Sequence, residues 1–255
     1  EILRCLVGSE MCIRDRIFTH IIKHRQGSSL SGRTFSPAAF SVLNTENLNI
    51  LERVFLMENT KTKIVSVANQ KGGVAKTTSA FNIAAILAQR EKRVLMIDLD
   101  PQSSLSVSCM KYEYDPDDIT ITELMSSIIN KKTVDFKTAV HHNEPNNIDY
   151  IPATITLSGI EVDLCRTRCC EMVLKRVISN YIGCYDYIII DCPPSLSNLL
   201  YNALSAADMV LIPVLAQEMA LSGIPLLLDS IDDIHEYANP CLLYTSDAAD
   251  DSLRV

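Results

Sequence analysis

Runs of apolar residues alternate with helical patterns between residues 57 and 240. Five apolar runs predict buried strands: residues 63–68, 93–99, 148–151, 185–190 and 209–214. Helical patterns lie between and beyond them: one that runs to about 89, then 119–130, 156–182, 196–206, and one from about 219. Near-continuous apolar strands separated by helices are typical of a parallel sheet covered on both faces. The pattern therefore predicts an α/β fold, a mostly parallel, twisted sheet with helices on both faces.

The loop after the first predicted strand, NQKGGVAKTTSA at residues 69–80, carries candidate chemistry. Ligands of open α/β sheets bind outside the carboxyl ends of the strands, where this loop lies. Backbone N–H groups of a glycine-containing loop and of the following helix start form a cradle for anions. Lys76 could reach the β- and γ-phosphates of a nucleotide, and the Thr77 hydroxyl could ligate Mg²⁺. The loop therefore predicts a site for ATP and Mg²⁺.

The loop departs from the common phosphate-loop pattern G-x-x-x-x-G-K-[ST] at two positions. Gln70 and Ala75 stand where that pattern has glycines. If position 75 requires a positive φ, the Cβ of alanine costs about 1 kcal/mol or more. We expect nucleotide binding to tolerate this departure, and the rate of hydrolysis to be sensitive to it.

Three aspartates end predicted strands near the same site. Asp191 follows the strand YIII, where an acid can organise Mg²⁺ through its coordinated water. Asp98 and Asp100 are two residues apart, so in an extended strand they would point the same way. The alternative is that aspartates at strand ends cap turns or helices.

These motifs together resemble the ParA/MinD family of P-loop ATPases. Residues 71–78 resemble its deviant Walker A motif, KGGxGKTT, apart from Ala75. VLMIDLDPQ at residues 94–102 and the stretch at residues 185–214 resemble further blocks of the ParA/Soj-type partition ATPases, in the family's order. The resemblance covers most of residues 61–225 and implies a P-loop NTPase fold. Pro101-Gln102 favours the partition branch over MinD.

The resemblance implies roles for individual residues. In this family a signature lysine, here Lys71, reaches across a nucleotide-sandwich homodimer to the partner's phosphates, and Asp100 helps to position the attacking water. Lys76 completes the implied catalytic set, and the implied metal residues are Thr77, Asp98 and Asp191. The implied nucleotide-binding residues are Gly72, Gly73, Val74, Ala75, Lys76, Thr77, Thr78, Asn202 and Pro213, the last two lining the base pocket. The alternatives are a solvated loop lysine for Lys71 and a hydroxyl that bonds the backbone for Thr78.

The resemblance implies a slow ATPase of the cytoplasm, associated with the nucleoid. The ATP-bound homodimer would bind DNA without sequence preference and take part in chromosome or plasmid partitioning, and a ParB-like partner would stimulate hydrolysis. A MinD-like ATPase that cycles on membranes through a C-terminal amphipathic helix is the alternative. A redox relative such as the nitrogenase iron protein, whose cysteines bridge an iron–sulfur cluster, is less well supported because its cysteine context is absent. An accessory ATPase of cellulose synthesis or of conjugative elements is not separated from a partition protein.

The amino-acid composition excludes few of these candidate functions. The 255 residues carry a formal charge of −8, which disfavours a protein that coats DNA by net charge alone. No apolar run reaches the ~20 residues that span a bilayer, so we expect no membrane partner. Basic residues at Lys131-Lys132 and at Arg166, Arg168, Lys175 and Arg176 could contact a phosphate backbone, although solubility explains them more simply.

Cysteines and histidines give no strong metal pattern. The chain has nine cysteines at uneven spacing and no visible signal peptide, which favours reduced thiols in a cytoplasm. Cys165, Cys169 and Cys170 are interpreted as structural thiols on a helix, because their spacing matches no usual zinc pairing. The pair at residues 141–142 is interpreted as solvated histidines in a polar loop.

Both ends of the chain resemble sequencing adapters. Residues 11–15 can be written in codons whose opposite strand, read one base out of frame, encodes residues 241–245. We therefore expect residues 1–16 and 241–255 to be artefact, and the natural ATPase domain, residues 57–240, to be incomplete at its C-terminus. Residues 17–56 are interpreted as untranslated leader before Met57. The alternative is a genuine, disordered extension with a short helix at residues 49–56.

Overall fold

The computed structural model describes residues 62–213 and 224–243. The expectations for residues 1–56, for Met57 and for the start of the last helix near 219 lie outside the described residues. Of the segment 241–255, only its first three residues are described. Leu242 is buried, and the Leu243 N–H donates to the Asp208 carbonyl across 3.0 Å. The origin of that segment stays a prediction.

Six strands form one sheet in the order β3-β4-β2-β5-β1-β6. The strands are β1 (Lys63–Val67), β2 (Val94–Asp98), β3 (His141–Asn143), β4 (Ile148–Ile151), β5 (Tyr187–Asp191) and β6 (Met209–Leu211). All neighbouring pairs are parallel except β3 with β4, which is antiparallel. The predicted mostly parallel sheet is confirmed, and each of the five predicted strands is present with bounds shifted by three residues or fewer.

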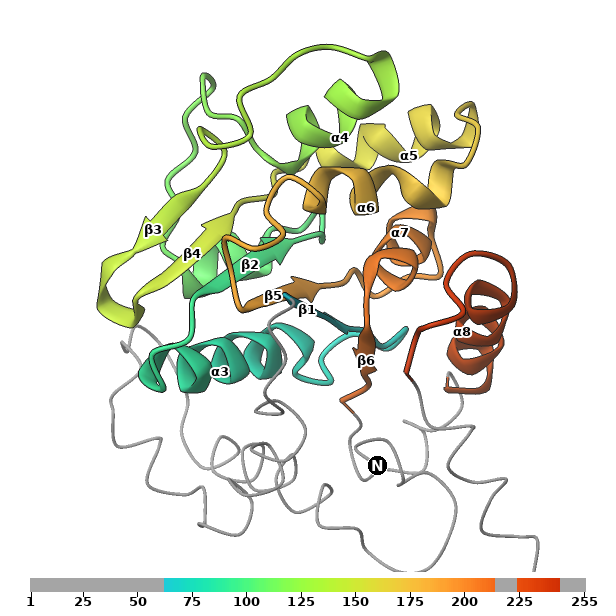
Figure 1. The fold of residues 1–255 in the computed structure, drawn as a ribbon, viewed down its shortest axis with the longest axis horizontal. Helices are drawn as coiled ribbons and strands as arrows, with labels where there is room; N and C mark the ends of the chain where they lie inside the picture. The colour runs from blue at the N-terminus through green and yellow to red at the C-terminus, as the bar shows by residue number, and fades with distance from the viewer. Residues whose placement is uncertain (1–61, 214–223, 244–255) are drawn as a thin grey trace, which may run out of the picture. The chain divides into compact units, whose positions relative to one another are not determined.

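Helices cover both faces of the sheet (Figure 1). Helix α3 (Lys76–Gln89) lies on one face, and α4, α5, α6 and α7 lie on the other. Their bounds are Ile121–Asn130, Leu157–Cys165, Val173–Ile178 and Asn198–Ala206, and α8 (Ile224–Tyr237) packs beside α7. Among the helices that the structure describes, none is long and apolar enough to cross a membrane.

Two local expectations are wrong. Residues 156–182 are not one helix: α5 ends at Cys165, a 3-10 turn follows at Cys170–Met172, and α6 then begins at Val173. The residues between Cys165 and Val173 leave the α-helical conformation, and Cys169 among them has a left-handed backbone, with φ of 52°. Nor do the two histidines lie in a loop. His142 pairs with Asp149 of β4, and its Nδ1 lies 2.6 Å from an oxygen of that carboxylate.

The three central strands β2, β5 and β1 form the most buried layer. Every residue of β2 and β5 is buried, as expected for strands covered on both faces. Ile189, in the middle of β5, has no exposed surface and lies opposite Val65 of β1 and Met96 of β2. The loops that leave the carboxyl ends of these strands are therefore held by a packed core.

Ile189→Ala tests this core directly. The substitution removes buried methyl groups from the central strand, so we expect it to lower the free energy of unfolding by about 2–5 kcal/mol. Urea denaturation followed by circular dichroism measures the change. Val107→Ala is the matched control, because the Val107 side chain is 56% exposed; an equal loss in both variants would contradict the assignment of the core.

Candidate functional site

The ends of three adjacent parallel strands gather the candidate residues. Strand β5 lies between β1 and β2, and the carboxyl ends of parallel strands meet at one edge of a sheet. The loop at residues 69–75 leaves β1 and leads into α3. Asp98 is the last residue of β2 and stands in register with Asp191, the last residue of β5. The sheet thus brings together groups from three distant parts of the sequence.

The main chain of the loop leaves room for a ligand. Gly73 has φ of 74°, a conformation that favours glycine. A Cβ built at Gly72 or at Gly73 would meet no atom within 4 Å, so open space lies over the loop. Ala75 has φ of 66° and ψ of 30°, so the expected need for a positive φ at this position is confirmed. The side chain of Val74 is buried, which leaves only its main chain for a ligand.

Asn69 braces the loop, a role that the sequence reasoning missed. Its amide Nδ2 donates to the Pro213 carbonyl across 2.8 Å, and its Oδ1 accepts from the Lys71 N–H across 2.9 Å. The second contact is a turn closed by an asparagine side chain two residues upstream, a known habit of asparagine that could have been predicted. Pro213 therefore meets the loop through its carbonyl group.

Lys76 begins α3 as a buried cation. Its residue is 7% exposed, and its Nζ donates to the Lys71 carbonyl across 3.3 Å. Burial lowers the pKa of Lys76, and the nearby carboxylates of Asp191 and Asp100 oppose this effect. An ammonium group has three donors, so two remain for a bound anion.

Asp191 presents a buried carboxylate that the Thr77 hydroxyl approaches without a hydrogen bond of good geometry. Neither oxygen receives a hydrogen bond of good geometry. Burial raises the pKa of Asp191, and Asp98 raises it further, whereas the Thr77 hydroxyl and Lys76 hold it down. Since buried carboxylate oxygens are almost always satisfied, this arrangement fits a divalent cation placed between Thr77, Asp191 and a phosphate. Among the described residues, no three His, Cys, Asp or Glu side chains could hold a metal by themselves.

Both carboxylate oxygens of Asp98 accept hydrogen bonds from neighbouring residues. One oxygen accepts from the N–H and the hydroxyl of Ser106, across 2.9 and 2.7 Å, and the other accepts from the Asp100 N–H across 3.1 Å. Burial raises the pKa of Asp98 to about 6, against the effect of these donors. The structure thus favours Asp98 as a support of the strand ends over a direct metal ligand. The role of Ser106 was missed, since nothing in the residues around it marks a partner eight residues away.

Asp100 lies in the turn after β2, not in an extended strand. The extended strand on which the comparison of Asp98 with Asp100 was based ends at Asp98 and does not reach Asp100. The Asp100 carbonyl accepts from the Ser103 N–H across 2.8 Å, and one carboxylate oxygen accepts from the Gln102 N–H across 2.9 Å. At 9% exposure the carboxylate lies at the boundary between the core and solvent. The Asp100 carboxylate acts electrostatically on Lys76. Its role at the attacking water stays a prediction.

The remaining predicted residues divide into two groups. Lys71 is half-buried, and no described residue binds its ammonium group, while Thr77 and Thr78 lie on the first turn of α3. Asn202 is 1% exposed, and its side chain accepts from the Leu174 N–H and donates to the Asn198 carbonyl. In this arrangement Asn202 joins α6 to α7, which gives no support to its predicted contact with a base.

The loop, its helix and the order of the sheet define a class of protein: the chain has the α/β fold of the P-loop NTPases. Comparison with known proteins then gives the family. A family profile described as an AAA domain matches residues 62–243. The chain is 41% identical over 186 residues to the sporulation initiation inhibitor protein Soj of Bacillus subtilis, covering 71% of this chain and 69% of Soj. The chain belongs to the ParA/Soj-type P-loop ATPases.

Two further similarities agree with this family. The chromosome partitioning protein ParA of Myxococcus xanthus is 40% identical over 180 residues, which are 71% of this chain and 62% of that protein. A crystal structure of cobyrinic acid a,c-diamide synthase from Mycobacterium smegmatis, with a bound ATP analogue and magnesium, is similar with a TM-score of 0.66. It is 36% identical and covers 71% of each chain. The chain thus spans between three fifths and three quarters of the length of these proteins.

Asp191→Asn tests the unpaired carboxylate. Because the pKa of Asp191 is raised, the native protein must ionise a buried group as the pH rises, and it loses stability in doing so. The asparagine cannot ionise. We therefore expect the variant, free of nucleotide and Mg²⁺, to be more stable than the wild type at pH 8, by about 1–3 kcal/mol, and to gain less at pH 5.

Urea unfolding at both pH values measures this difference. Asp117→Asn, which removes an exposed carboxylate, is the control and should change little at either pH. A gain that is equal at pH 5 and pH 8 would show that the charge of Asp191 is not the cause.

Proposed function

We propose that the chain binds ATP with Mg²⁺ and hydrolyses it within a homodimer that acts in chromosome or plasmid partitioning. The observation that carries the proposal is the arrangement at the strand ends. A buried lysine with unused donors and a buried carboxylate that receives no hydrogen bond of good geometry lie beside a loop with two positive-φ residues, and open space lies over Gly72 and Gly73 of that loop. Membership of the ParA/Soj-type ATPases, and a related structure with a bound ATP analogue and magnesium, support the choice of ligand.

The β- and γ-phosphates would lie on the loop at residues 72–77. Its main-chain N–H groups and the start of α3 provide positive potential, and Lys76 adds a full charge. Bound Mg²⁺ would neutralise charge on the phosphates. Thr77 and Asp191 would hold that cation, and Asp98 would keep the end of β2 fixed through Ser106.

Hydrolysis requires a positioned water and a cation where negative charge develops. Asp100, at the edge of the buried site, is the proposed acceptor that orients the attacking water. Lys71 is the proposed cation supplied to the second subunit. Gly72 and Gly73 are exposed, so the outer side of the loop is open to a partner chain. A lysine delivered from another subunit acts as an arginine finger does.

The wider cycle follows from the family. The dimer would bind DNA without sequence preference, a ParB-like partner would stimulate a slow hydrolysis, and the protein would be cytoplasmic and associated with the nucleoid. The names of the relatives, which include a chromosome partitioning protein, support this cycle.

Lys76→Ala tests the loop. The variant loses the buried cation that would bind two phosphates, and each charge-assisted hydrogen bond contributes about 1.5–3 kcal/mol. We expect wild-type affinity for Mg-ATP to be lost in isothermal titration calorimetry. Lys137→Ala, which removes an exposed lysine elsewhere, should bind as the wild type does. Unchanged affinity in a folded Lys76→Ala protein would sink the assignment.

Lys71→Ala and Asp100→Ala separate dimer formation from hydrolysis. Asp100→Ala should bind Mg-ATP and form the dimer, yet release phosphate at least about tenfold more slowly, because the water loses its acceptor. Lys71→Ala should bind Mg-ATP and stay a monomer. Sedimentation velocity with and without ATP, beside a phosphate-release assay, gives both readings. Full turnover by Asp100→Ala, or an ATP-dependent dimer of Lys71→Ala, would refute the corresponding role.

A further inference from the structure

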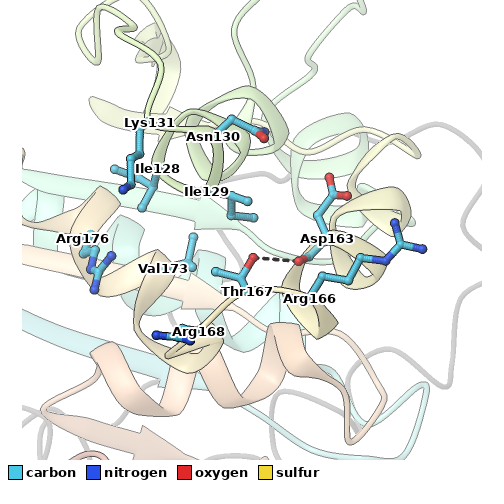
Figure 2. A pocket seen from close by; sticks show the side chains of 10 residues that line it. All are labelled: Ile128, Ile129, Asn130, Lys131, Asp163, Arg166, Thr167, Arg168, Val173 and Arg176. Atoms are coloured by element: carbon cyan, nitrogen blue, oxygen red, sulfur yellow. Dashed lines mark hydrogen bonds between the residues drawn. The ribbon is translucent and has the colours of Figure 1, made fainter.

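A second pocket lies away from the strand ends, among the helices of the opposite layer. It has a volume of about 450 Å³ and lies between the end of α4, the turn after α5 and the start of α6 (Figure 2). Ile128, Ile129 and Val173 form its apolar part. No residue of the loop at 69–78 and none of the strand-end aspartates belongs to its lining. The pocket is therefore separate from the proposed ATP site.

Cations surround this pocket, and we call them the rim cations: Lys131, Arg166, Arg168 and Arg176. One acidic residue, Asp163, shares the lining. Four positive charges and one negative give the lining a formal charge of +3, although the whole chain carries −8. Figure 2 shows these side chains on different sides of the hollow. A concentration of one charge sign in a concave site raises the local concentration of the opposite ion.

The rim cations have no anionic partner among the described residues. The ion pairs that join two described residues are Arg93 with Asp186 and His142 with Asp149. Asp163 uses its main-chain carbonyl to accept from the Thr167 hydroxyl across 2.8 Å, which is drawn in Figure 2. All four rim cations are exposed, so their donors are open to a ligand.

The tertiary structure creates this set from separate parts of the sequence. Lys131 has a left-handed backbone that ends α4, with φ of 53°. Arg166 ends α5, Arg168 lies in the turn that follows, and Arg176 lies on α6. The break in the expected helix 156–182, between Cys165 and Val173, places Arg176 on a helix separate from α5. A continuous helix could not enclose the pocket in this way.

We propose that this pocket binds a small molecule that carries two or more phosphoryl groups next to an apolar or flat body, the class to which nucleoside diphosphates belong. Guanidinium groups bind phosphate oxygens in pairs, and three of the four rim cations are arginines. The apolar part of the pocket suits a base or another flat group. Its volume is in the usual range for sites of small ligands.

Other occupants fit less well. Duplex DNA is convex and contacts proteins mainly through its phosphates, so it would leave the apolar part of the pocket without a contact. A single carboxylate would leave most of the +3 charge unbalanced. A ligand with two phosphoryl groups and an apolar or flat body matches both the positive charge and the apolar part of the pocket.

Calorimetry with ADP tests the proposal, using the full chain in the Lys76→Ala background so that the loop site is silenced. We expect residual binding of ADP to this protein, and pyrophosphate should compete with it. Adding Arg166→Gln and Arg168→Gln should weaken that binding at least tenfold. The matched control adds Lys111→Gln and Lys137→Gln, two exposed lysines outside the pocket, and should bind as the Lys76→Ala parent does.

Each result decides the question. Absence of ADP binding to the Lys76→Ala protein, or equal binding by the two charge-matched variants, would overturn the proposal. A short DNA duplex is the second probe: if its binding depends on Arg166 and Arg168 while ADP binding does not, the rim cations belong to a nucleic-acid surface and the small-ligand site is refuted. Lys131→Gln with Arg176→Gln repeats the test from the other side of the pocket, should the first pair unfold the protein. These results test the pocket alone. The proposed ATP site is tested separately, by the loss of Mg-ATP binding in the single variant Lys76→Ala.

Discussion

Burial of charge at the ends of three adjacent parallel strands is the constraint on which the rest of the site depends. Removing a carboxylate or an ammonium group from water costs several kcal/mol unless partners replace the water. Ser106 and the Asp100 N–H supply partners for Asp98. Asp191 has none of this kind among the described residues, and Lys76 has one main-chain acceptor. The site is thus electrostatically incomplete, and a phosphate with its cation would complete it.

The backbone conformation of the loop carries a second cost in free energy. Ala75 adopts a left-handed conformation that disfavours a residue with a Cβ by about 1–2 kcal/mol. Such strain persists where surrounding contacts determine the conformation. Here Asn69 ties the loop to Pro213, and the Ser79 N–H donates to the Ala75 carbonyl across 2.8 Å as α3 begins. The loop keeps the shape of a phosphate cradle although the usual glycine is absent.

The same sheet positions the second pocket indirectly. Helices α4, α5 and α6 pack together on the face opposite α3, and Asn202 of α7 receives the N–H of Leu174. Val173, which lines the pocket, immediately precedes that residue. The pocket and the strand that carries Asp191 are therefore joined through α7, which follows β5 in the chain.

The sequence by itself determined the strands, most helices and the identity of the loop. Buried strands and helix periods are local patterns, and the motif from Lys71 to Thr78 is continuous, so each can be recognised without tertiary contacts. Only the folded chain decided that Ser106 would hold Asp98, that Asn202 would join two helices, and that His142 would pair with Asp149 on an edge strand of three residues. It also decided that the helical pattern would break between Cys165 and Val173, where the chain has neither glycine nor proline. These features depend on residues that are distant along the chain, or on a backbone conformation that no nearby residue type demands. Packing selected them, and a pattern in sequence does not record packing.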